Sequence, residues 1–265
     1  MVLLQALNRA LILRDMPLPK LLLPLIATLL LFASASRAAN VTVRDGDTIQ
    51  LGDVTYRLDG VDAPELDQIC INDQADPTTC GLDARDQLTK LVAGRQVHCD
   101  DLGPEKAYPK RHIGLCIAEG ETDSLNVQLV RAGFAMDLEP SAKGRFLADE
   151  ASARDERKGL WQGCFVAPQD FRIGKKDGPL FGAACHTDRD RQIREVLFPD
   201  DLAQPPDCSI KAKFAVRARV TGNVGVYQLR GCPSYAGTQA DRWFCSEDDA
   251  QAAGFRRGFN CRAGK

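Results

Sequence analysis

Two short acidic strings carry residue types that suit metal-assisted hydrolysis. They read DGDT over residues 45–48 and RLDGVDAPE over residues 57–65. Asp47 and Asp62 are expected at strand ends, where two short carboxylates and a neighbouring backbone carbonyl can hold a hard cation such as calcium. Taken singly, each string is more typical of an ordinary turn or loop.

Glu65 and Arg57 add groups that suit phosphate chemistry. Glu65 lies three residues beyond Asp62, past the rigid Ala63-Pro64 step, so its carboxylate can take a proton from a water beside the metal. Arg57 lies five residues before Asp62, and its planar guanidinium can donate to two oxygens of one phosphate. The set therefore suits a metal-bound phosphate and an activated water.

The elements expected around these strings form a small mixed barrel. Alternating apolar and polar residues predict strands over residues 41–51, around an Asp-Gly turn or bulge at 45–46, and over 54–58, 95–99 and 112–117. Apolar residues at helical spacing, with caps and glycine stops, predict helices over residues 82–92, 124–132 and 142–158. We expect the Leu160-Trp161 pair after the last helix to pack back on the body. This order predicts a five-stranded Greek-key barrel, an OB-fold, with three helices.

Together the two strings resemble the signature of the staphylococcal nuclease-like (thermonuclease) family. That signature pairs an Asp-Gly-Asp-Thr strand with an Arg-x-x-x-x-Asp-x-Pro-Glu segment. The resemblance covers about residues 41–165, including LVRAGFA at 129–135 and GLW at 159–161. It implies the same barrel with three helices, and calcium-dependent hydrolysis of phosphodiester bonds in DNA or RNA.

The resemblance also implies a role for each matching residue. Asp47 and Asp62 would bind Ca2+ through their side chains, and Ala63 through its carbonyl, where the family often has threonine. Glu65 would be the general base for the attacking water. Arg57 would stabilise charge on the phosphoryl oxygens.

The second catalytic arginine of the family is harder to place. It usually follows Tyr-Gly directly, whereas this chain reads KAYPKRHI over residues 106–113. We expect Arg111 to take the role, because of its distance from the following strand, with Lys110 as the competing cation. Residues 136–140 read MDLEP, where some family members have base-contacting tyrosines. Base stacking is not expected there, and a preference for DNA or RNA stays open.

The N-terminal residues predict export. Arg9, Arg14 and Lys20 precede an apolar run at 21–33, and small residues follow to residue 39, which is the order of a secretory signal peptide. The run is shorter than the ~20 apolar residues that a membrane-spanning helix needs, so cleavage is favoured over an uncleaved membrane anchor. We expect a secreted or periplasmic monomer without a stable membrane span. Translation could begin at Met1 or at Met16.

Composition and cysteine count limit the function classes. The 44% hydrophobic content argues against a disordered or polytopic membrane protein. Without residues 1–39 the chain has 30 basic and 35 acidic residues, so nucleic acid would be held by local cations or a metal rather than by bulk charge. All 10 cysteines remain, which predicts disulfides in an exported chain. Cys70 with Cys80, and Cys99 with Cys116, are the close pairs.

A second unit is expected at the C-terminal end. The expected division is a signal peptide at 1–39, a nuclease-like domain at 40–170, a linker at 171–207 and a small α+β domain at 208–265. The last resembles a small cysteine-containing domain of some bacterial nuclease-like proteins, and its ending is similar to the zinc module of Ada-type DNA repair proteins. Because the chain has no Cys-x-x-Cys, we favour disulfides among its four cysteines, which are Cys208, Cys232, Cys245 and Cys261.

Three functions are consistent with these features. The first is an exported calcium-dependent nuclease. The second is a non-catalytic nucleic-acid-binding or envelope-associated module on the same barrel. The third is a structural envelope protein whose locally basic C-terminal unit does the binding.

Overall fold

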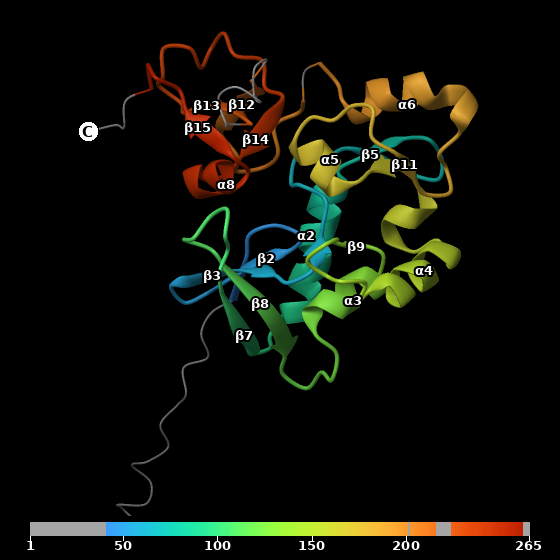
Figure 1. Ribbon diagram of the computed structural model, residues 1–265. Helices are drawn as coiled ribbons and strands as arrows, with labels where there is room; N and C mark the ends of the chain where they lie inside the picture. The colour runs from blue at the N-terminus through green and yellow to red at the C-terminus, as the bar shows by residue number, and fades with distance from the viewer. Residues whose placement is uncertain (1–40, 201, 216–223, 262–265) are drawn as a thin grey trace, which may run out of the picture. The chain divides into compact units, whose positions relative to one another are not determined.

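The structure, a computed structural model, describes residues 41–200, 202–215 and 224–261 (Figure 1). The expected signal peptide at residues 1–39 lies outside the described residues. The alternating residues 214–220 also predict a strand, and most of that range lies outside the described residues too. Within the described ranges, no helix has the length and apolar character needed to cross a bilayer.

A five-stranded mixed sheet forms the frame of the first part of the chain. Its strands, in order across the sheet, are β1 (Val41–Val43), β2 (Thr48–Leu51), β3 (Val54–Leu58), β8 (His112–Ala118) and β7 (Val97–Pro104). β3 and β8 run parallel, and the other neighbours are antiparallel. Together with the helices and the C-terminal α+β region, this sheet confirms the expected fold class, with β1 and β7 as its edge strands.

The first three residues of the DGDT string form the turn between β1 and β2, so the Asp-Gly turn or bulge expected within residues 41–51 is the turn of a hairpin. Asp45 Oδ1 accepts a hydrogen bond from the backbone N–H of Asp47 at 3.0 Å, a local contact that favours a turn. A Cβ on Gly46 would lie 2.7 Å from the Cβ of Ala63. Glycine at this position therefore lets the second acidic string pack directly against the first.

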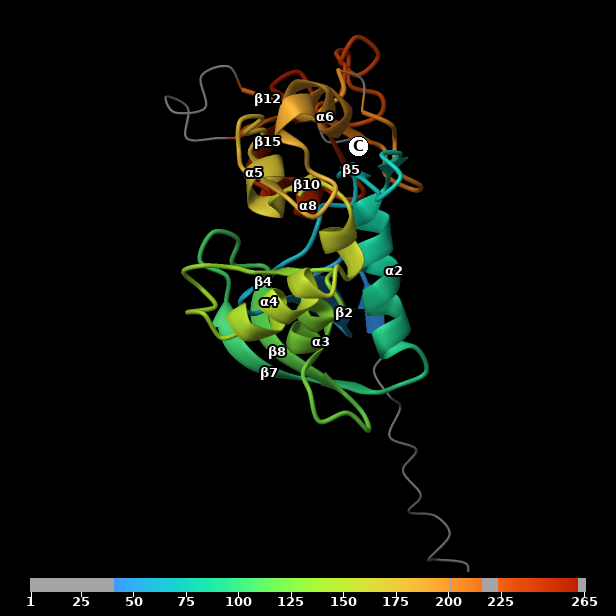
Figure 2. The same cartoon turned by 90° about the vertical axis from the view of Figure 1, so that its right-hand side faces the viewer.

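Three helices accompany the sheet, namely α2 (Cys80–Val92), α3 (Leu125–Arg131) and α4 (Leu147–Asp155). Leu88 of α2 and Leu125 of α3 are fully buried and share one core with Ile49 of β2. α3 begins where the Ser124 side chain accepts a hydrogen bond from the Val127 N–H at 3.3 Å. α3 and α4 lie side by side (Figure 2).

The third helix is shorter than the expected range of 142–158. Lys143 and Gly144 have positive φ angles of 52° and 71°, which prevent a right-handed helix before Leu147. Arg157, at φ 52°, stops the helix at its other end. Trp161 follows in η2 (Gly159–Gln162) and is buried, so the prediction that it packs back on the body is confirmed.

Gly133 offers a test of this packing. It has φ +77°, and a Cβ there would lie 2.2 Å from the Lys158 carbonyl oxygen, whereas Gly120, at φ +84°, has nothing within 4 Å of its Cβ position. We expect Gly120→Ala to lower the free energy of unfolding by about 1 kcal/mol, from backbone strain alone. Gly133→Ala should lower it by about 3 kcal/mol or more, because a backbone overlap is added. Equal losses in urea denaturation would contradict the packing described.

The stretch expected as a linker, residues 171–207, is structured. Here the chain forms the end of α5 (Pro168–Arg172), β11 (Leu180–Phe181) paired with β10 (Phe165–Val166), η3 (Thr187–Arg189) and α6 (Asp190–Leu197). Ile193 and Leu197 on one face of α6 are buried in a core that also contains Trp243. The stretch therefore contributes its own buried side chains.

A four-stranded sheet forms the C-terminal part of the described chain. Its order is β14 (Arg242–Phe244), β12 (Ile210–Phe214), β13 (Gly225–Gln228) and β15 (Phe255–Arg257). The helix α8 (Glu247–Ala252) begins at Ser246, whose side chain accepts a hydrogen bond from the Asp249 N–H at 3.1 Å. These four strands and α8 confirm the expected α+β region.

All ten cysteines pair. The pairs are Cys70–Cys80, Cys99–Cys116, Cys164–Cys185, Cys208–Cys245 and Cys232–Cys261. Both close pairs expected from the sequence are confirmed, and the four C-terminal cysteines pair with one another as expected rather than forming a zinc set. Five disulfides suit an extracellular or periplasmic compartment.

Candidate active site

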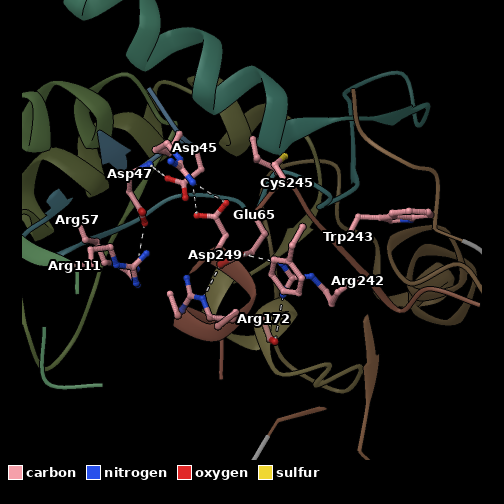
Figure 3. Close-up of a pocket in the computed structure, with 15 residues that line it drawn as sticks. Asp45, Asp47, Arg57, Glu65, Arg111, Arg172, Arg242, Trp243, Cys245 and Asp249 are labelled. Atoms are coloured by element: carbon pink, nitrogen blue, oxygen red, sulfur yellow. Dashed lines mark hydrogen bonds and ion pairs between the residues drawn. The ribbon is translucent and has the colours of Figure 1, made fainter. Parts of the chain in front are cut away.

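The two acidic strings meet through their carboxylates. Asp62 lies in β4 (Val61–Asp62), which pairs with β9 (Met136–Asp137). Arg57 Nη2, from β3, donates to Asp47 Oδ2 at 3.2 Å (Figure 3). The same nitrogen donates to Asp62 Oδ1 at 2.7 Å. Asp47 Oδ2 also accepts the Ala63 N–H at 3.1 Å. Arg172 Nη2 also donates to Asp62 Oδ1, so two guanidinium groups already contact this carboxylate pair.

Glu65 is held by two arginines that lie far from it in sequence. Arg172 Nε donates to Oε1 at 2.6 Å, and Arg242 Nη2 donates to Oε2 at 2.9 Å. Burial alone would raise the pKa of Glu65, but Arg172 and Arg242 lower it to about 2. Glu65 is therefore ionised at neutral pH, with both oxygens accepting from guanidinium groups.

Arg57 and Arg111 line the same pocket and keep donors available. Arg111 is 12% exposed, and its Nε donates to Glu105 Oε2 at 2.7 Å. Over the described residues, no hydrogen bond uses the terminal nitrogens of Arg111, or Nε and Nη1 of Arg57. Lys110 is 68% exposed, pairs with Asp248 and lies outside this pocket. The pocket therefore contains Arg111, not the competing cation.

Arg57 contributes to the linings of two cavities. The first, of about 50 Å³, has Arg57, Glu65 and Arg111 in its lining, and the C-terminal residues Phe244 and Asp249 also contribute to its wall (Figure 3). It has room for a few water molecules. The second, of about 320 Å³, is lined by Arg57 together with the following residues: Leu58, Asp59, Gly60, Glu105, Lys106, Ala107, Ile113, Leu138 and Ser141. No aromatic side chain is among these described lining residues.

Comparison with known proteins assigns the first part of the chain. Residues 55–163 match the family model described as staphylococcal nuclease homologue. This segment is therefore similar to that family. Residues 199–257 match the ArfC family. The succinoglycan biosynthesis protein ExoI of Rhizobium meliloti (strain 1021) is 30% identical over 122 residues, which are 46% of this chain and 62% of ExoI. The chain thus spans less than two thirds of that relative.

The nuclease-homologue segment contains Arg57, Asp62, Glu65 and Arg111, and Asp47 lies eight residues before it. The resemblance read from the two strings is therefore confirmed. The two arginines that hold Glu65 lie outside the segment. Arg172 ends α5, and Arg242 belongs to the ArfC match. No local pattern marks either as part of a site, because their partners lie 107 and 177 residues away in sequence.

Asp47 and Asp62 could hold a hard cation that takes few of its ligands from protein side chains. Asp62 Oδ2 is buried without a hydrogen-bond partner in the described structure. Burial, followed by the charge of Asp47, raises the pKa of Asp45 to about 8, so the Asp45 carboxyl is mostly protonated at neutral pH and adds little negative charge there. Groups of three or more His, Cys, Asp or Glu able to hold a metal do not occur among the described residues. A cation at Asp47 and Asp62 would therefore take its other ligands from backbone carbonyls, water and substrate.

Proposed function

We propose that the protein is an exported calcium-dependent nuclease that hydrolyses phosphodiester bonds in DNA or RNA. The observation that carries this proposal is the convergence of Glu65, Arg57 and Arg111 on one pocket, directly beside the Asp47 and Asp62 pair. A base, two phosphate-binding guanidinium groups and a carboxylate pair together suit phosphodiester hydrolysis. The similarity of residues 55–163 to the nuclease-homologue family supports the same reaction class.

Each side chain has a distinct role in the proposed reaction. Calcium, bound by the Asp47 and Asp62 side chains and the Ala63 carbonyl, would supply positive charge to a phosphate oxygen. Glu65 takes a proton from the attacking water at an oxygen that has released its arginine. Arg57 and Arg111 donate their remaining N–H groups to the phosphoryl oxygens, where charge increases at the five-coordinate phosphorus.

The wider cavity supports a nucleotide-sized substrate. Arg57 lines both cavities, so a phosphate at Arg57 can have its sugar and base in the 320 Å³ cavity. Lys106 at the rim adds a positive charge near the backbone of such a ligand. Since none of the described lining residues is aromatic, we expect the base to be held without stacking and sequence preference to be weak.

A non-catalytic binding module on the same fold is the second candidate. The observation that favours it is that both oxygens of Glu65 already accept from arginines, which leaves neither free for water. The cavity of about 50 Å³ beside Glu65 also admits a phosphodiester only after side chains move. If the protein is such a binding module, it should bind oligonucleotides without cleaving them.

Cleavage of end-labelled single-stranded DNA and RNA by the protein lacking residues 1–39 separates the two candidates. We expect cleavage in calcium and none in excess EGTA. Cleavage that persists in EGTA would reject the calcium role. A gel shift without cleavage in either condition would reject the nuclease and favour the binding module.

The choice between Arg111 and Lys110 gives a further prediction. Arg111→Gln should lower kcat by about 10²-fold, because one donor to the transition state is lost. Lys110→Gln should leave kcat near its wild-type value, since Lys110 lies outside the pocket. Steady-state cleavage of a short oligonucleotide measures both, and the reverse order of effects would assign the role to Lys110.

The remaining expectations are part of the same proposal. We propose a signal peptide at residues 1–39, a nuclease-like domain at 40–170, a connecting stretch at 171–207 and a small C-terminal domain at 208–265. Export to the periplasm or outside the cell, and a monomeric state, are proposed with it. Size-exclusion chromatography with light scattering checks the monomer.

A further inference from the structure

Arg242 joins the C-terminal sheet to the proposed base. It is the first residue of β14, in the ArfC match, and its side chain is 1% exposed. Its Nε donates to both carboxylate oxygens of Asp67 at 3.0 and 2.8 Å, and its Nη2 donates to Glu65 Oε2 at 2.9 Å. Nη1 donates to the Arg172 carbonyl at 3.4 Å. Every nitrogen of this guanidinium therefore has an acceptor.

The surroundings of Arg242 are rigid. Its guanidinium carbon lies 5.0 Å from the ring centres of both Phe171 and Phe244, within the range of cation–π attraction. Asp67 is fully buried and also accepts the Trp243 N–H at 2.7 Å, so the carboxylate binds β14 through two neighbouring residues. Removal of Arg242 would leave the Asp67 charge buried with one fewer partner.

Arg172 is held less tightly than Arg242. Its side chain is 19% exposed and pairs with Asp62 as well as with Glu65 Oε1. Over the described ranges, no hydrogen bond uses its Nη1. The two oxygens of Glu65 thus differ, since Oε2 faces a fixed donor and Oε1 faces one that solvent and substrate can reach.

We propose that Arg242 is a positioning residue for Glu65, so that the ArfC-matching region supplies a permanent part of the nuclease site. The inference rests on the proposed function. Arg242 holds Oε2, which sets the direction of the carboxylate and leaves Oε1 to exchange Arg172 for the attacking water. A releasable inhibitory plug would need an exposed and weakly held anchor, whereas this anchor is buried, donates from all three nitrogens and lies between two phenyl rings.

The test compares Arg242→Gln and Arg242→Lys with Arg257→Gln, in the protein lacking residues 1–39. Arg257 is the matched control, because it also donates from Nε and Nη2 to a glutamate, Glu247, in the same region but does not contact Glu65. We expect Arg242→Gln to lower kcat by about 10²-fold with KM little changed, as a misdirected catalytic group does. Arg242→Lys, which keeps the charge but has one nitrogen in place of the three that donate here, should recover part of the loss. Arg257→Gln should match the wild type.

Thermal unfolding of each variant shows whether it is folded at the assay temperature. If Arg242→Gln is unfolded there, the kcat of Arg242→Lys tests the positioning role. A wild-type kcat in the folded Arg242 variants, an increase in kcat, or an equal loss in Arg257→Gln would overturn the positioning role while leaving the nuclease proposal intact. A wild-type protein that cleaves neither DNA nor RNA would overturn both.

Discussion

Glu65→Gln is expected to lower kcat for single-stranded DNA by about 10³-fold, because an amide cannot take the proton of the attacking water. The fold should be retained, since Asp62 still pairs with Arg172 and Asp67 still pairs with Arg242. Steady-state cleavage measures the loss, and circular dichroism checks the fold.

Glu121→Gln is the matched control for this substitution. Glu121 also pairs with an arginine, Arg95, but lies outside both cavities. We expect it to cleave at the wild-type rate. Near-normal cleavage by Glu65→Gln would reject Glu65 as the base, whatever the behaviour of the control.

Arg57→Gln should produce the second large effect, a fall in kcat of about 10²- to 10³-fold with a smaller change in KM. Arg57 lines both cavities, and its guanidinium donates to both carboxylates of the proposed cation site. Arg57→Lys keeps the charge but cannot donate two parallel hydrogen bonds, so we expect only partial recovery.

The ratio of kcat to KM effects distinguishes transition-state stabilisation from simple substrate binding. Arg95→Gln, which removes a surface arginine, is the control and should change neither constant. A rise in KM with an unchanged kcat in Arg57→Gln would show that Arg57 holds substrate and transition state equally.

Much of the candidate site can be predicted from the sequence because its residues lie close together along the chain. The site residues Asp47, Arg57, Asp62 and Glu65 lie within one stretch of 19 residues. They belong to a turn, to the consecutive strands β3 and β4, and to the loop after β4, so sequence spacing determines which side chains can meet. The same holds for Cys70 with Cys80, which lie ten residues apart. Short separations leave few ways to arrange the chain between the partners.

Contacts between distant segments were not predictable. Arg172 and Arg242 reach Glu65 only because α5 and β14 pack against the loop that follows Asp62, and no periodicity encodes that approach. Cys164–Cys185 was missed for the related reason that the weak pattern around it gave no expected pair. The structured stretch 171–207 did carry one signal. Ile193 and Leu197, four residues apart, are the buried face of α6.

Hydrolysis in ¹⁸O-labelled water tests whether a water molecule attacks the phosphorus atom. A short oligonucleotide would be incubated with the protein and calcium in H₂¹⁸O, and the masses of the products measured by mass spectrometry. We expect the water oxygen to form the new bond to phosphorus, so that the phosphate-bearing product carries one ¹⁸O and the released sugar hydroxyl carries none. Glu65→Gln should give almost none of the labelled product. An intact oligonucleotide, or cleavage without ¹⁸O in the phosphate, would contradict the proposed hydrolysis.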